Sequence, residues 1–252
     1  MDNNNFSNYT YRNEALLDGI STNKAVAGSF LWMFLGALIT LLVGISSTSI
    51  VANIAISNPL SLMIIFLVCF VFQIILTTRI HKFIYAAPNF AKSLISFILY
   101  SALTGFTFSF LFVYFDVAVL NQVFAGVSLY FLLLALATYL FRKKINRAAS
   151  FAYIGLGVLF ITSTILFLVS MFLFNGAYFN ALYLGISILG ILVFSITTMV
   201  DIKRHYDSLD YRGNKNVMMI GFAFDLYLDF INIFIYVLRI LLILGKNVTR
   251  RD

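Results

Sequence analysis

Two aspartates, Asp225 and Asp229, lie one helical turn apart within the strongly apolar stretch FAFDLYLDFINIFIYVLRILL, residues 222–242. A carboxylate in hydrocarbon is costly unless it is paired, protonated or facing a hydrated cavity. Asp229 lies about 12 residues into this predicted helix, which places it roughly 18 Å from the start of the helix. Simple adhesion between helices does not require a carboxylate at that depth. We therefore expect Asp229 to have a function.

The two aspartates belong to a longer polar stripe on the same predicted helix. At about 100° per residue its members fall within about 80° of one another, so they share one face. Such a face should turn away from lipid, which predicts that this last helix is central in a bundle. Taken alone, Asn232 and Tyr236 fit ordinary interhelical hydrogen bonds. Because Asn232 lies next to the aspartates, it also fits an ion pathway. The stripe consists of Asp225, Asp229, Asn232, Tyr236 and Arg239.

A third membrane aspartate, Asp201, ends the preceding apolar run in FSITTMVDIKRHY. Ser195, Thr198 and Asp201 are three residues apart and approximate one face of that helix. If the last two helices are neighbours, Asp201 and Asp229 can meet and share one proton, which makes a proton-sensitive latch. The same two carboxylates, when ionised, offer hard oxygen ligands suited to Ca²⁺. We predict Asp201 and Asp229 as the sensor and as a Ca²⁺ site.

A basic residue close to this pair would help to keep the latch formed by Asp201 and Asp229 closed. Arg79, in QIILTTRIHKF, ends an earlier run on the same predicted side of the membrane. It could make a charge-assisted bond to Asp201, or it could only anchor its helix at the membrane surface. We interpret His81 as an interfacial residue and place His205 in a soluble inner loop.

Hydroxyl groups also follow one face of the third apolar run. For any single one of them, packing against a neighbouring helix is the favoured interpretation. Three helices with inward polar stripes nevertheless suggest a hydrated cavity. The residues of this stripe are Ser93, Ser96, Tyr100, Thr104 and Thr107.

Composition identifies the elements that must position these residues. The chain has 252 residues, of which 62% are hydrophobic and only 11% are charged. Soluble domains carry roughly a quarter charged residues, so this is an all-α membrane protein. Its solid apolar runs disfavour a membrane β-barrel, whose strands alternate apolar and polar residues. The single cysteine, Cys69, excludes a disulfide framework and a cysteine metal site, and we expect no cofactor.

Seven apolar runs predict a polytopic bundle of seven transmembrane helices. We expect residues 1–24 to form a cytoplasmic tail, 25–246 a single membrane domain and 247–252 a short basic tail. The lipid bilayer is the expected environment, with no nucleic acid partner. The runs cover 26–46, 60–79, 90–114, 118–141, 150–174, 178–201 and 217–244.

The distribution of basic residues predicts the orientation. With a cytoplasmic N-terminus, the inner segments hold all but four of the 17 Lys and Arg residues. The three outer loops before the last span hold none. An odd number of spans then places the basic C-terminal tail outside, which we treat as an exception to the rule. The four exceptions are Arg239, Lys246, Arg250 and Arg251.

Several of these segments resemble the Bax inhibitor-1 family, over nearly all of residues 24–245. LYLDFINIFIYVLRIL is similar to the family's last helix, and FSITTMVDIKRHY to the end of its sixth. NFAKSLISFILYSALTGFTFS matches the third-helix pattern through Tyr100, Gly105 and Ser109. KAVAGSFLWMFLGALIT resembles the first helix, and FRKKINRAASF the basic loop after the fourth.

The resemblance implies a seven-helix fold and a pH-sensitive Ca²⁺ leak gated by a pair of aspartates. The family's pair falls on Asp201 and Asp229, while Asp225 matches an acidic position found in some relatives. Two departures stand out: Ile202 replaces the usual threonine, and Ile145 replaces the usual acidic residue. Short tails and compact loops favour a bacterial plasma membrane.

Other functions stay open. The chain could instead be a non-conducting regulator that binds a partner such as a membrane protease or a stress-response protein. A proton-coupled transporter is less favoured, because no inverted repeat is visible. We expect no enzyme: the glycine-containing aspartate motif of intramembrane aspartyl proteases is absent, as are HExxH, phosphate-loop and Gly-x-Ser-x-Gly motifs.

Overall fold

The computed structural model of the chain describes residues 3–141, 145, 154–159, 161–163, 176–208 and 215–244. The regular elements in this part are all helices, and six of them are long and apolar enough to cross a membrane. The prediction of an all-α polytopic membrane protein is therefore confirmed. Most of the predicted fifth span, 150–174, lies outside the described residues, so the count of seven stays a prediction; the helix Ile154–Ser163 is its described part. The long elements are α1 (Asn3–Ser57), α2 (Pro59–His81), α3 (Phe90–Tyr114), α4 (Val117–Phe141), α6 (Gly176–Ser208) and α7 (Lys215–Leu244).

Local sequence signals explain where α2 and α3 begin. Pro59 opens α2, where its missing N–H is not needed, and the side chain of Asn58 accepts a hydrogen bond from the Ser61 N–H at 3.1 Å. Asn89 caps α3 in the same way, accepting from the Lys92 N–H at 3.0 Å. Between the two helices, the π-helix η1 (Lys82–Ala86) continues directly from the end of α2.

Helices α1 and α3 approach so closely that only glycine fits at their crossing. A Cβ atom on Gly105 would lie 2.5 Å from the backbone oxygen of Thr40, and one on Gly36 would lie 2.5 Å from the ring of Phe97. Small residues of this kind let helix backbones pack tightly in a membrane. The first and third helices therefore form one tightly packed pair.

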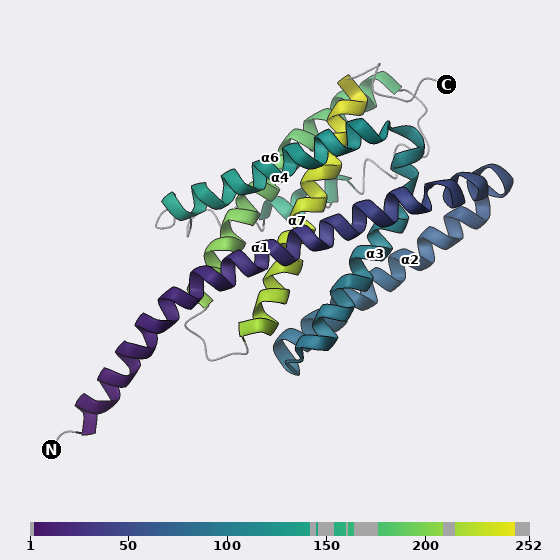
Figure 1. Cartoon of the computed structure of the whole chain (residues 1–252). Coiled ribbons are helices and arrows are strands. Elements are labelled where there is room, and N and C mark those ends of the chain that lie inside the picture. The colour runs from purple at the N-terminus through teal and green to yellow at the C-terminus, as the bar shows by residue number, and fades with distance from the viewer. Residues whose placement is uncertain are drawn as a thin grey trace.

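Helix α7 packs against α1, α3, α4, α6 and η1. In Figure 1 it runs between α6 on one side and α3 on the other. Tyr227, which is fully buried, joins α7 to α1 through a 2.7 Å hydrogen bond between its hydroxyl and that of Thr40. The Thr40 hydroxyl donates in turn to the carbonyl of Ser101 on α3, at 2.9 Å.

The hydroxyl stripe of α3 is used for packing. Ser93 donates to the carbonyl of the cap residue Asn89, and Thr104 donates to a carbonyl one turn earlier on α3. Thr104 also accepts a hydrogen bond from Gln73 of α2 at 3.0 Å. No residue of α3 lines either of the polar cavities described below. These contacts agree with packing as the role of Ser93 and Thr104, and a hydrated cavity along the rest of this stripe stays a prediction.

Candidate functional site

A polar cavity of about 350 Å³ opens along the aspartate face of α7. We call it the carboxylate cavity. Its walls come from the end of α2, η1, the Ile154–Ser163 helix, α6 and α7. Three carboxylates contribute to one lining, so the aspartates singled out by sequence do come together. The lining residues are His81, Tyr85, Leu156, Phe194, Thr197, Asp201, Arg204, Asp225, Leu228, Asp229 and Asn232.

Asp229 is the deepest of the three carboxylates. Asp229 is 5% exposed and lies about 20 Å along α7 from the first residue of that helix. The hydroxyl of Thr198 on α6 lies 3.0 Å from Asp229 Oδ2 and 2.7 Å from the carbonyl of Phe194. An ionised Asp229 accepts a hydrogen bond from this hydroxyl, whereas a protonated Asp229 donates to it while the hydroxyl proton turns to Phe194. Thr198 can therefore satisfy both protonation states.

The basic neighbour of Asp201 differs from the one predicted. Arg204, three residues further along α6, places Nη1 3.6 Å from Asp201 Oδ1. Arg79 is exposed and does not line the cavity. The docking of Arg79 on Asp201 therefore stays a prediction for another state of the protein. The periodicity of α6 alone could have indicated Arg204, since residues three apart on a helix are neighbours.

Asp225 faces a histidine from another helix. His81 Nδ1 lies 2.8 Å from the carbonyl of Thr77, so this nitrogen carries the proton that is donated to that oxygen. Nε2 is thereby directed at Asp225 Oδ1, at 4.0 Å. The interpretation of His81 as only an interfacial residue missed this position, because nothing in the sequence shows that the end of α2 lies beside α7.

No hydrogen bond joins the carboxyl groups of Asp201 and Asp229 in the described part of the structure, although both line the same cavity. Their shared proton stays a prediction. Among the described residues no three His, Cys, Asp or Glu side chains are arranged to hold a metal ion. The Ca²⁺ site expected at Asp201 and Asp229 stays a prediction.

Asn232 lies on the wall of the carboxylate cavity and also on the wall of a second cavity, likewise of about 350 Å³. We call the second one the tyrosine cavity, because Tyr236 is on its wall. Both cavities share Leu156, Phe194 and Asn232 as lining residues. Together they follow the predicted polar stripe of α7 over several turns. The tyrosine cavity is lined by Leu156, Leu159, Ser163, Phe194, Asn232 and Tyr236.

His205 does not lie in a soluble loop as the sequence suggested. Helix α6 continues to Ser208, and His205 is 1% exposed within it. Its Nε2 lies 3.0 Å from the hydroxyl of Ser29 on α1. The centroid of its ring lies 3.8 Å from the ring centroid of Phe222 on α7. The prediction failed because the sixth run was ended at the first charged residue, whereas the helix continues for two more turns.

The two departures from the family pattern are buried. Ile202 and Ile145 are 1% and 4% exposed, and Ile202 is part of the main hydrophobic core.

Ser195, which shares a predicted face with Asp201, forms a hydrogen bond with the hydroxyl of Tyr130 on α4 at 2.7 Å. It therefore joins two helices and does not line the carboxylate cavity.

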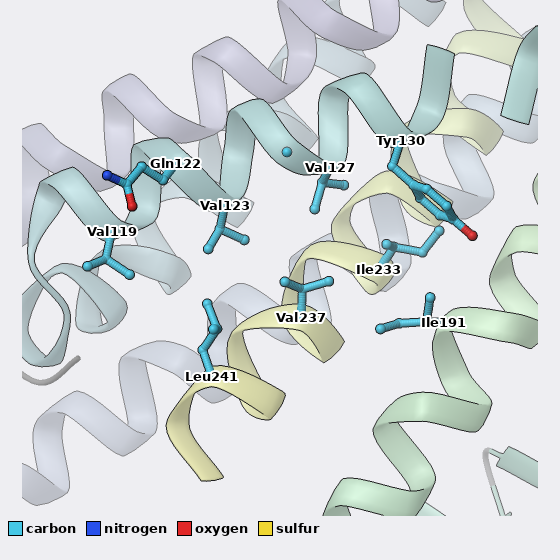
Figure 2. Close-up of a pocket in the computed structure, with 10 residues that line it drawn as sticks. Val119, Gln122, Val123, Val127, Tyr130, Ile191, Ile233, Val237 and Leu241 are labelled. Carbon is cyan, nitrogen blue, oxygen red and sulfur yellow. The ribbon is translucent and has the colours of Figure 1, made fainter. Parts of the chain in front are cut away.

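A larger and mostly apolar cavity of about 550 Å³ lies on another side of α7 (Figure 2). Figure 2 shows the side chains of Val123 and Val127 on α4 and those of Ile233 and Val237 on α7 around it. It contains no charged residue and none of the stripe residues of α7. This cavity is consequently separate from the candidate pathway.

Comparisons with known proteins agree with the sequence patterns. The family model described as inhibitor of apoptosis-promoting Bax1 matches residues 22–246. The chain is also similar to an uncharacterized protein of Borreliella burgdorferi, with 32% identity over 225 residues. That match covers 87% of this chain and 91% of the relative.

Proposed function

Because this chain belongs to the Bax inhibitor-1 family, we propose that it is a pH-sensitive Ca²⁺ leak channel of a bacterial plasma membrane. The observation that carries the proposal is the carboxylate cavity, which gathers Asp201, Asp225 and Asp229 within a helical membrane protein. Carboxylates at such depth attract cations and are rarely kept without a function. The basic residues of the sequence favour the cytoplasm for the end at which α7 begins.

In the proposed cycle, proton occupancy decides whether the carboxylates attract cations. A protonated Asp229 is neutral and hydrogen-bonded to Thr198, so it offers no charge to Ca²⁺. Loss of the proton gives an anion that still accepts from the same hydroxyl. Asp201 then belongs to the sensor with Asp229, and Asp225 and Asn232 extend the pathway on either side of Asp229.

The basic groups around the cavity set how easily a cation enters. Arg204 lies beside Asp201 and lowers the attraction of this carboxylate for another cation. His81 lies beside Asp225 and has the same effect only when its imidazole is protonated. Movement of α2 would carry His81 away from α7. Under this proposal Arg79 acts only if such a movement brings it to Asp201.

The test is Ca²⁺ uptake into liposomes that contain a Ca²⁺ dye, measured between about pH 5 and 8, where a perturbed carboxyl pair can titrate. We expect a pH-dependent flux in the wild type and a flattened pH profile in Asp201→Asn and Asp229→Asn. Asp116→Asn is the matched control, because Asp116 is exposed before α4 and asparagine keeps the oxygen that caps Ala118. Absence of flux from folded wild type at every pH would contradict the proposal.

One observation favours a second candidate, a non-conducting regulator. The N-terminal part of α1 continues as a helix well beyond the rest of the bundle (Figure 1). A projecting helix is a suitable binding element for a membrane protein partner. Deletion of residues 1–23 separates the two candidates: it should leave a channel's flux in place but abolish the effect of a regulator on its partner.

A further inference from the structure

We infer that the side chain of Tyr236 is a plug that closes the polar path at the end of the bundle where α7 finishes. The inference rests on the proposed function, since it treats the two adjoining cavities, which share three lining residues, as one path. Tyr236 follows Asp229 by two helical turns, or about 10 Å. Along α7 it is the lining residue farthest from the three carboxylates.

The ring of Tyr236 lies directly on the backbone of α6. A Cβ atom added to Gly190 would lie 2.5 Å from Cε2 and 2.6 Å from Cζ of this ring. Only glycine leaves room for the ring at this position, and any larger side chain must displace it. The close approach explains why a glycine lies in the middle of a membrane helix, where it otherwise weakens the helix.

Aromatic and cationic groups hold the ring on its other sides. Phe194 lines both cavities. The centroid of its ring lies 5.9 Å from that of Tyr236, and the two ring planes are inclined at 40°. The guanidinium carbon of Arg239 lies 5.5 Å from the ring of Tyr236 and 5.5 Å from that of Tyr183 on α6. Cation–π contacts of this kind favour one orientation of the tyrosine.

Arg239 also places a positive charge just beyond the plug. A cation that passes Tyr236 in either direction must approach this guanidinium, which repels it. The stripe of α7 therefore changes character along its length. It begins with two carboxylates that attract Ca²⁺ and ends with a ring and an arginine that oppose its passage.

The plug can be tested without measuring Ca²⁺. In a Cys69→Ala background the chain has no cysteine, so Ser163→Cys places a single thiol on the wall of the tyrosine cavity. A membrane-impermeant, cationic methanethiosulfonate is added to membrane vesicles of each orientation. In separate vesicles, Leu244→Cys in the same background identifies the side on which α7 ends, because Leu244 is the last residue of that helix.

From that side, Tyr236→Ala should raise the labelling rate of Ser163→Cys at least about tenfold, because an occluded thiol reacts only during rare opening. Tyr236→Phe keeps the ring and should label as slowly as the parent. Gly190→Ala, which displaces the ring, should resemble Tyr236→Ala. Equal labelling rates for Tyr236→Ala and Tyr236→Phe in folded protein would overturn the inference.

This readout separates the plug from the proposed function. Faster labelling of Tyr236→Ala without Ca²⁺ flux in any variant supports the plug and rejects the channel. A pH-dependent flux with labelling unaffected by Tyr236→Ala supports the channel and rejects the plug.

Discussion

Helix α7 places polar groups on two opposite faces, and the surroundings of these groups differ between the two faces. Toward α1 and α3, Tyr227 is fully buried and its hydroxyl is hydrogen-bonded to that of Thr40. Toward α6, Asp225 and Asp229 line a cavity of about 350 Å³. One face packs tightly against neighbouring helices, and the other borders a cavity lined by carboxylates.

The two faces differ because hydroxyl and carboxyl groups need different surroundings in a membrane protein. A hydroxyl can be satisfied by one or two neighbours, so close helix packing is compatible with it. A carboxylate that changes its protonation state needs partners for both states and room for water. Breaking the tightly packed face should therefore reduce stability, while changes on the cavity face should alter the response to pH.

The largest effect is expected at the α1–α3 crossing. Gly105→Ala places a Cβ atom 2.5 Å from the backbone oxygen of Thr40, and backbone cannot move aside cheaply. We expect a loss of about 1–3 kcal/mol in the free energy of unfolding, as found for overpacked sites. Unfolding in a denaturing detergent series measures it. Gly126→Ala is the control, because nothing lies within 4 Å of its added Cβ, and an equal loss there would contradict the prediction.

The second effect concerns the partner of Asp229. Thr198→Val removes the hydroxyl bonded to Asp229 Oδ2 and should cost about 1–3 kcal/mol in the free energy of unfolding, because a buried carboxyl group loses its hydrogen-bond partner. It should also move the pH midpoint of Ca²⁺ uptake. A move in either direction identifies the protonation state that Thr198 stabilises more. Thr138→Val is the control, since this buried hydroxyl bonds only to a carbonyl of its own helix, and the midpoint should not move.

A smaller effect is expected from Tyr227→Phe. The substitution keeps the ring and removes one interhelical hydrogen bond, which in membrane proteins contributes about 0.6 kcal/mol on average. The pH midpoint of uptake should stay at its wild-type value, because Tyr227 is on the face away from the carboxylates. A shifted midpoint in folded Tyr227→Phe would show that the two faces are coupled, which would contradict the division drawn above.

Sequence was sufficient for the helical class and for the residues of the cavity face. The stripe on α7 was visible because charged residues inside an apolar run are rare and their spacing fixes their face. Asp201 was visible for the same reason at the end of a run. These predictions used only the chemistry of a single helix.

The neighbours of those residues could not be predicted, because they depend on how helices pack. His81 faces Asp225 only because α2 and η1 end beside α7, and Gly190 matters only because Tyr236 lies on it. Arg204 was missed for a local reason, since the sixth run was ended too early. Arg79 was considered because of its charge and its predicted side of the membrane, and the structure leaves it exposed.

The smallest effect distinguishes these two arginines. Arg204 is 54% exposed and its 3.6 Å contact with Asp201 is open to solvent, so the ion pair should contribute no more than about 1 kcal/mol. We expect Arg204→Gln to leave stability nearly unchanged but to raise Ca²⁺ uptake modestly at low ionic strength, because a positive charge beside Asp201 is lost. Arg79→Gln is the matched comparison and should have no effect if the described arrangement is the one that admits ions. A larger change in Arg79→Gln than in Arg204→Gln would instead mean that α2 moves, that Arg79 reaches Asp201 in the closed state, and that the cavity face has a second arrangement.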